Sequence, residues 1–207
     1  GKDDSRYDKP QLSSLGQAML MSRWKFAFDP YGIGVGQILV TYANWNSEEE
    51  KASIKNCILG LLEEGDIPVL NESDPVSNKE IVSMEKRISE NDKLTSMVTF
   101  LVDANAVLFL TDERGVYTGD PKRDPSAKLY EEIDIRNMPL DLVISSGGAL
   151  VTKGSGGIAQ KLDAAINCAR QGMLTVIASR EEDVILRFAR GESVGTRLGA
   201  SNRIREK

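Results

Sequence analysis

The chain has 207 residues, and its 26 lysines and arginines against 31 aspartates and glutamates give a formal net charge of −5. Hydrophobic residues make up 41% of the chain, which is enough to bury a sizeable core. The acidic balance argues against a nucleic-acid partner, because binding to a phosphate backbone requires a basic surface. The chain contains no histidine, which excludes Ser-His-Asp catalysis, histidine general bases and histidine-ligated zinc within it.

The two cysteines, Cys57 and Cys168, show no paired metal-ligand spacing, and each lies in a stretch of apolar periodicity. We expect both to fill core positions. So few cysteines favour a reducing compartment, in keeping with a cytoplasmic location. No apolar run approaches the roughly 18 residues that a membrane-spanning helix needs, so we expect no membrane association.

In the first third of the chain, the residue pattern predicts an alternation of helices and strands. Apolar residues at helical spacing predict a helix over 11–28, and a run rich in β-branched residues predicts a strand over 35–41. A capping box at Ser47 and Glu50 begins a second helix, and 67–70 read as a short buried strand. The apolar residues that we expect to face the core from these two helices are Leu12, Leu15, Met19, Phe26, Ile54, Ile58, Leu61 and Leu62.

The rest of the chain continues the same alternation. Apolar periodicity predicts helices over 91–102, 157–171 and 181–190. Almost uninterrupted apolar runs predict strands over 106–110 and 174–178, and such strands are usually buried on both faces. In the last helix the residues expected to point inward are Val184, Ile185 and Phe188.

Strands that alternate with helices predict parallel pairing with helical crossovers. We therefore expect an α/β protein, a three-layer sandwich with a mainly parallel central sheet. The chain shows no internal repeat and no low-complexity linker, so we expect a single domain over residues 1–207. No regular element is predicted for 128–153 or for the basic segment after Gly191.

Polar residues follow or precede several predicted elements at positions where open α/β sheets bind ligands. Asp74 ends the loop after one strand, Asp112 follows another, and Asp92 stands at a helix start. Taken singly, each aspartate is typical of a cap or a turn. Taken together, the three carboxylates could hold magnesium-bound water, orient a lysine or bind a substrate ammonium group.

A glycine-rich run, Gly-Ser-Gly-Gly at 154–157, stands directly before a predicted helix. Backbone N–H groups in such a run can converge on an anion, and the positive end of the helix dipole adds to the attraction. Lys161, one turn into the helix, could reach a phosphate oxygen. The alternative is a flexible turn followed by a surface lysine, and the pattern alone favours neither. The run is not a Walker A loop, because no Gly-Lys-Ser/Thr follows at the required spacing.

Five motifs occur in a fixed order and are followed by Gly191 and the Val-Gly-Thr of 194–196. They are Val-Gly-Gln-Ile-Leu-Val-Thr (35–41), Ile-Pro-Val-Leu-Asn-Glu-Ser-Asp (67–74), Glu-Asn-Asp-Lys-Leu-Thr-Ser (90–96), Leu-Phe-Leu-Thr-Asp-Glu-Arg-Gly-Val-Tyr-Thr-Gly-Asp-Pro (108–121) and Gly-Ser-Gly-Gly-Ile-Ala-Gln-Lys (154–161). With these motifs the chain resembles the glutamate 5-kinase family of the amino-acid kinase superfamily, from about Leu12 to Leu198. The fourth motif is shared with relatives such as uridylate kinase and aspartate kinase.

The resemblance implies phosphorylation of the side-chain carboxylate of L-glutamate by ATP and Mg²⁺, the first step toward proline. It implies that Asp74 and Asn91 bind glutamate, and that Asp92 holds the catalytic Lys161 in place. It implies no metal ligand in the chain, with Mg²⁺ carried mainly by the nucleotide phosphates. An ionised carboxylate nucleophile requires no general base, which suits a chain without histidine. The residues that it places at the nucleotide are Thr111, Asp112, Ser155, Gly156, Gly157, Ile158, Ala159, Gln160 and Lys161.

The family pattern also begins with a strand that carries a lysine and a Gly-Ser turn, which the 207 residues lack. The resemblance therefore implies a kinase domain that is incomplete at its N-terminus, and no RNA-binding-like module follows at the C-terminus. We expect the 207 residues alone to fold poorly and to show no measurable glutamate kinase activity. A homo-oligomer is in keeping with the family. Two alternatives stay open: a kinase of the same fold for another acceptor, such as UMP or aspartate, and a nucleotide-binding or assembly module without turnover.

Overall fold

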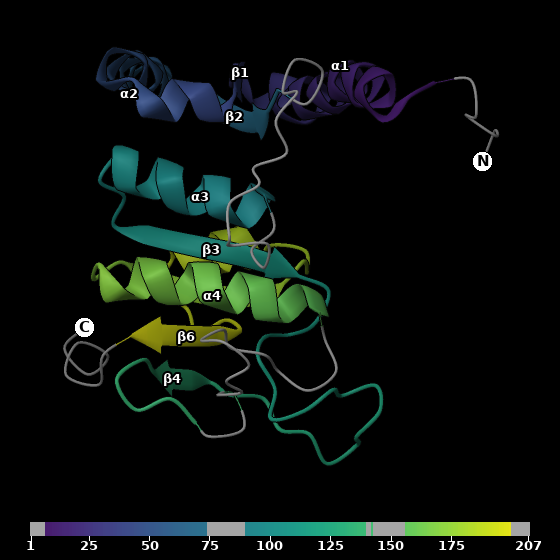
Figure 1. Cartoon of the computed structure of the whole chain (residues 1–207). Helices are drawn as coiled ribbons and strands as arrows, with labels where there is room; N and C mark the ends of the chain where they lie inside the picture. The colour runs from purple at the N-terminus through teal and green to yellow at the C-terminus, as the bar shows by residue number, and fades with distance from the viewer. Residues whose placement is uncertain (1–6, 74–89, 140–141, 143–155, 200–207) are drawn as a thin grey trace. The chain divides into compact units, whose positions relative to one another are not determined.

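The computed structural model describes residues 7–73, 90–139, 142 and 156–199 (Figure 1). Backbone contacts divide the chain into two compact units, Gly1–Met84 (unit 1) and Glu85–Lys207 (unit 2). The single domain expected from the sequence stays a prediction.

Unit 1 contains a two-stranded parallel sheet and two α-helices. The strands run in register from Val35 opposite Ile67, and Asp66 Oδ1 accepts a hydrogen bond of 2.7 Å from the N–H of Gly34 at their start. Half of the expected capping box is formed: Ser47 Oγ accepts from the N–H of Glu50 at 3.3 Å, whereas Glu50 Oε2 accepts from Asn44 Nδ2 at 2.7 Å. The elements are α1 (Lys9–Phe28), η1 (Asp29–Tyr31), β1 (Val35–Val40), η2 (Tyr42–Asn46), α2 (Glu48–Glu63) and β2 (Ile67–Glu72).

Burial in unit 1 departs from the sequence expectation. Among its described residues, the only buried apolar side chains are Val40 and Ile58. Met19 is 62% exposed and Phe26 is 83% exposed, so the apolar face expected on α1 is not buried. Helical spacing creates an apolar face, but burial also requires a surface that packs against it. The expected core residues that are exposed are Leu12, Leu15, Met19, Phe26, Leu62 and Cys57.

Unit 2 contains a four-stranded sheet in the order β3-β5-β6-β4. β3 and β5 pair in parallel, β6 runs antiparallel to β5, and β4 is parallel to β6. The sequence did not predict β4 and β6, because three or four residues are too few to show a period. The elements are α3 (Glu90–Leu101), β3 (Ala106–Thr111), β4 (Glu132–Asp134), α4 (Gly156–Arg170), β5 (Leu174–Ser179), α5 (Val184–Ala189) and β6 (Thr196–Gly199).

Helices cover both faces of the unit 2 sheet. Alternate residues of β3 join different clusters: Val107 and Phe109 pack with α4, whereas Leu108 and Leu110 pack beside α5. β3 thus has packing partners on both faces, as expected, but only Val107 and Phe109 are buried, whereas Leu108 and Leu110 are half-buried. Every described strand pair except β5–β6 is parallel, which confirms an α/β fold rich in parallel pairing.

The helices of unit 2 place most of their apolar residues as expected. Leu162 and Cys168 of α4 are fully buried, which confirms their place in the core. Ile185 is a correction, because it is 59% exposed while its neighbour Val184 is buried. Adjacent residues of a helix point about 100° apart, so Val184 can face the sheet while Ile185 faces solvent.

Candidate functional site

The candidate site lies at one edge of unit 2. Figure 1 shows the C-terminal end of β3 and the N-terminal ends of α3 and α4 on the same side of this unit. β5 is parallel to β3, with Thr111 opposite Ser179, so its C-terminal end lies there too. Ligands of open α/β sheets bind at this edge because strand ends leave backbone groups free and helix N-termini attract anions.

An ion pair joins the N-terminal halves of α3 and α4 at this edge. Lys161 Nζ donates to Asp92 Oδ1 at 2.8 Å. The Asp92 side chain is 7% exposed and that of Lys161 is 26% exposed. A buried carboxylate with a charge-assisted hydrogen bond fixes the position of its partner more firmly than a surface pair does. The structure thus brings Asp92 and Lys161 together, as the resemblance implied.

A short chain of hydrogen bonds lies directly behind Asp92. The Ser96 hydroxyl donates to the main-chain oxygen of Asp92 at 3.2 Å and accepts from Cys168 Sγ at 3.5 Å. Thr99 Oγ1 lies 3.8 Å from the same sulfur. These polar contacts connect the inner face of α3 to α4. The two helices that carry the ion pair are therefore also held together behind it.

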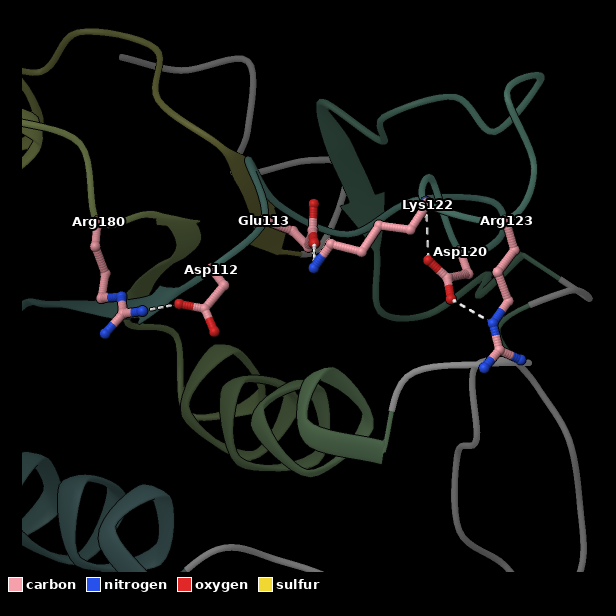
Figure 2. A network of polar contacts seen from close by, with 6 residues as sticks. All are labelled: Asp112, Glu113, Asp120, Lys122, Arg123 and Arg180. Atoms are coloured by element: carbon pink, nitrogen blue, oxygen red, sulfur yellow. Dashed lines mark hydrogen bonds and ion pairs between the residues drawn. The ribbon is translucent and has the colours of Figure 1, made fainter. Parts of the chain in front are cut away.

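The strand ends contribute Thr111 and Asp112. The main-chain oxygen of Thr111 accepts from the N–H of Arg180 at 3.1 Å, which extends the pairing of β3 and β5. Asp112 forms an exposed ion pair with the Arg180 side chain (Figure 2). Sequence reasoning missed Arg180, although it lies two residues beyond a predicted strand, just as Asp112 does.

The loop after Asp112 is held by ion pairs in which Lys122 and Arg123 are exposed, whereas Glu113 and Asp120 are half-buried (Figure 2). Lys122 Nζ lies 2.7 Å from Glu113 Oε1, and this hydrogen bond and charge raise the pKa of Lys122. Asp120 accepts from the N–H of Lys122 at 2.9 Å and pairs with Arg123 at 3.4 Å. Ion pairs with one exposed partner add little stability, so the network mainly shapes the loop beside the strand end.

The Val-Gly-Thr segment of 194–196 holds the buried side of this loop through hydrogen bonds of Thr196. Thr196 is fully buried, and its hydroxyl accepts from the N–H of Val116 at 2.8 Å and donates to the main-chain oxygen of Tyr130 at 2.5 Å. A Cβ on Gly195 would lie 2.1 Å from the main-chain oxygen of Ile177, so only glycine fits. Val116 is itself a buried core residue, so this part of the loop is packed against the interior of unit 2.

The remaining predicted residues are placed only in part. Asn91 is exposed and precedes Asp92 in the first turn of α3. Gly156, Gly157, Ala159 and Gln160 belong to the first turns of α4, and only their backbone is described. Ile158 packs against the main core, so its side chain has a structural contact of its own. Asp74 and Ser155 lie outside the described residues.

Among the described residues, no group of three or more histidine, cysteine, aspartate or glutamate residues gathers in a way that could hold a metal ion. Among the same residues, no helix is long and apolar enough to cross a membrane.

Comparison with known proteins adds sequence relatives. The family model described as "Amino acid kinase family" matches residues 3–179. The glutamate 5-kinase of Photobacterium profundum is 38% identical over 191 residues, which are 92% of this chain and 49% of the relative. That of Acidovorax ebreus is 39% identical over 189 residues, 91% of this chain and 48% of the relative. The chain thus spans about half the length of the curated relatives it matches.

Solved structures give the same fold. The match to an isopentenyl phosphate kinase covers 87% of this chain and 66% of the kinase chain, with a TM-score of 0.57 and 22% sequence identity. The match to the product complex of T. acidophilum isopentenyl phosphate kinase covers 92% of this chain and 73% of that one, with a TM-score of 0.54 and 17% sequence identity. These identities show the fold alone, whereas the family model and the curated relatives confirm the resemblance drawn from the motifs. The chain belongs to the amino acid kinase family.

Proposed function

We propose that the protein transfers the γ-phosphoryl group of ATP to the side-chain carboxylate of L-glutamate, giving glutamyl 5-phosphate on the route to proline. The observation that carries this proposal is the Asp92–Lys161 ion pair, which holds an ammonium group beside the strand ends of unit 2. The curated relatives named glutamate 5-kinase support glutamate as the acceptor. Asp74 and Asn91 are the residues proposed to bind it.

In the proposed reaction an oxygen of the glutamate carboxylate attacks the γ-phosphorus. The bond from that phosphorus to the bridging oxygen breaks, and ADP leaves with the electron pair. No base has to accept a proton, because the nucleophile is already ionised. Phosphoryl transfer depends mainly on positioning and on neutralising negative charge.

Lys161 would supply part of that neutralisation. Its ammonium group is held 2.8 Å from Asp92 Oδ1, and this contact limits where the positive charge can lie. The N-terminus of α4 adds main-chain N–H groups suited to phosphate oxygens. Thr111 and Asp112, at the end of β3, are the residues proposed to contact the rest of the nucleotide.

Mg²⁺ carried by the nucleotide would offset part of the negative charge of the phosphates. In this proposal the nucleotide phosphates are its main ligands. The chain's own part is to hold the phosphates and the carboxylate in line.

The test is glutamate-dependent release of ADP by the full-length protein. We expect Lys161→Ala to lower turnover by about 10²–10³-fold, the usual cost of one contact that stabilises developing charge. Lys128→Ala, at an exposed lysine of the same unit, is the matched control and should leave turnover unchanged. Near-normal turnover in Lys161→Ala would mean that Lys161 serves only as a structural partner of Asp92.

The same assay decides between glutamate and the alternatives. Aspartate and UMP are offered in parallel with glutamate, and faster ADP release with either would reassign the acceptor. Nucleotide binding without ADP release for any acceptor would favour a nucleotide-binding module without turnover.

A further inference from the structure

A buried thiol lies behind the candidate site and takes no part in the proposed reaction. Cys168 is fully buried, and among the α4 side chains that the structure describes it is the only buried one that can donate a hydrogen bond. A thiol in apolar surroundings is chemically inert, so the feature to explain is its polar contact and not its reactivity. The other buried side chains of α4 are all aliphatic: Leu162, Ala164, Ala165, Ile166 and Ala169.

The thiol meets polar partners from α3. Its S–H donates to the Ser96 hydroxyl at 3.5 Å, and Ser96 is itself only 8% exposed. That hydroxyl donates in turn to the main-chain oxygen of Asp92 at 3.2 Å. Thr99 Oγ1 lies 3.8 Å from the sulfur and donates to the main-chain oxygen of Ser96 at 2.8 Å. All three polar side chains therefore have partners in this one arrangement of α3 on α4.

These contacts lie at the same distance behind the ion pair on both helices. Thr99 follows Asp92 along α3 by about two turns, which returns a side chain to nearly the same face. Cys168 follows Lys161 along α4 by the same step. The two helices therefore run in the same direction here and meet at two polar points along matching faces.

The polar contacts can fix the register of the two helices more firmly than the apolar ones. Apolar contact is non-directional, so aliphatic side chains alone select a register only weakly. A slide of one turn, about 5.4 Å, would separate the thiol from both hydroxyls and leave buried polar groups unpaired, which is costly. The same slide would move Lys161 away from Asp92. Both polar points therefore favour the same register.

We propose that Ser96 and Cys168 form a positioning pair, which fixes the register of α3 on α4 and thereby places the Lys161 ammonium group for phosphoryl transfer. The kinetic part of this proposal rests on the proposed function, whereas its structural part, that the pair holds Asp92 against Lys161, does not. Loss of the pair should lower kcat, because stabilisation of a developing charge is sensitive to small displacements. The KM values should change little, since neither residue contacts a substrate.

The kinetic test compares variants of the full-length protein by glutamate-dependent ADP release. We expect Cys168→Ala and Ser96→Ala each to lower kcat by about fivefold, the fold-change that one hydrogen bond is worth. The KM values for ATP and glutamate should stay within about twofold. Cys168→Ser keeps a donor at the same place and should restore most of the loss. Cys57→Ala, at the exposed cysteine of unit 1, is the matched control and should leave kcat unchanged.

A second background separates positioning from a general effect on stability. In Lys161→Ala the charge to be placed is gone, so adding Cys168→Ala should not reduce the remaining turnover further, although it should still lower the temperature of unfolding. An equal further loss in that background would overturn the proposal, because a merely structural role does not depend on Lys161. Unchanged kcat in both Cys168→Ala and Ser96→Ala would overturn it as well.

A measurement without substrate tests the structural part separately. The carbon NMR shift of the Asp92 carboxyl group responds to its contact with Lys161. We expect this shift to move in Cys168→Ala, to return in Cys168→Ser and to stay in place in Cys57→Ala. The same shift in every variant would overturn the positioning pair. The expected pattern of shifts in a protein that releases no ADP with glutamate would support the pair and overturn only the proposed function.

Discussion

The two units of the chain differ in how they use their apolar residues. In unit 1 the described residues bury only Val40 and Ile58, while α1 leaves a broad apolar face exposed. In unit 2 two clusters of buried residues pack against opposite faces of one sheet. Both units follow the same alternation of strand and helix, so local sequence pattern does not explain the difference.

The difference follows from the number of layers that each unit can assemble. Two parallel strands with helices are marginal by themselves, because a parallel sheet is stable when both faces are covered. Four strands with α4 on one face and α5 on the other meet that condition. The described residues of unit 1 do not meet that condition, whereas unit 2 contains its own core and the candidate site.

The largest effect should appear in amide hydrogen exchange of the full-length protein. We expect amides of β5 to exchange at least about a thousandfold more slowly than those of β1, since protected cores open only with a large share of the global unfolding free energy. The measurement is exchange followed by mass spectrometry or NMR. Equal protection of both strands would mean that unit 1 is as well covered as unit 2.

Two glycines with similar positive φ angles differ in how tightly the chain packs around them, and substitution of each by alanine tests that difference. Gly195 (φ +58) lies against β5, whereas Gly32 (φ +67) has open space around its Cβ position. We expect Gly195→Ala to lower the free energy of unfolding by about 4 kcal/mol or more, and Gly32→Ala by about 1–2 kcal/mol. Urea unfolding followed by circular dichroism measures both. A smaller loss at Gly195 than at Gly32 would contradict the tight packing of β6 on β5.

Truncation of apolar side chains tests the burial difference directly. Leu162→Ala, in the core of unit 2, should cost about 3 kcal/mol through lost burial and a cavity. Met19→Ala, on the exposed face of α1, should stay within about 0.5 kcal/mol. Trp24 and Trp45 both lie in unit 1, so tryptophan fluorescence reports that unit while circular dichroism reports both. A cost at Met19 close to that at Leu162 would show that the α1 face is covered in solution.

The smallest effect concerns an exposed turn of unit 2 rather than its core. Hydrogen bonds from the Ser126 hydroxyl and N–H hold the pKa of Asp124 below its usual range. A lowered pKa in the folded state means that the turn is favoured above the ordinary pKa of aspartate and loses this help as pH falls through the folded value. Ser126→Ala removes the hydroxyl bond and should raise the pKa of Asp124, as followed by NMR titration. Ser53→Ala, in unit 1, is the control and should not move it.

Part of the fold could be predicted because its signals are local. The helix over α4 and the strand β3 each carry a complete apolar pattern, and the structure confirms both. β4 and β6 carry no such pattern, because their pairing is decided by strands far away in sequence. Ile185 and the α1 face were assigned wrongly for a related reason: spacing shows which residues share a face, not whether that face meets a partner.

The candidate site, like the fold, could be predicted from the sequence only in part. The motifs indicated Asp92, Lys161 and Asp112 by type and position, but nothing local in the sequence shows that a carboxylate on α3 and an ammonium on α4 lie 2.8 Å apart. Arg180 was overlooked because a single arginine after a strand is common, and only its ion pair with Asp112 sets it apart.

The sequence by itself determined the helices, the long strands and the family, because these depend on short-range periodicity and on motifs in order. The tertiary structure decided which apolar faces are buried, how the short strands pair, why Gly195 must be glycine, and that Asp92 holds Lys161. Each of these depends on groups that are distant along the chain and meet only when the sheet and its helices assemble.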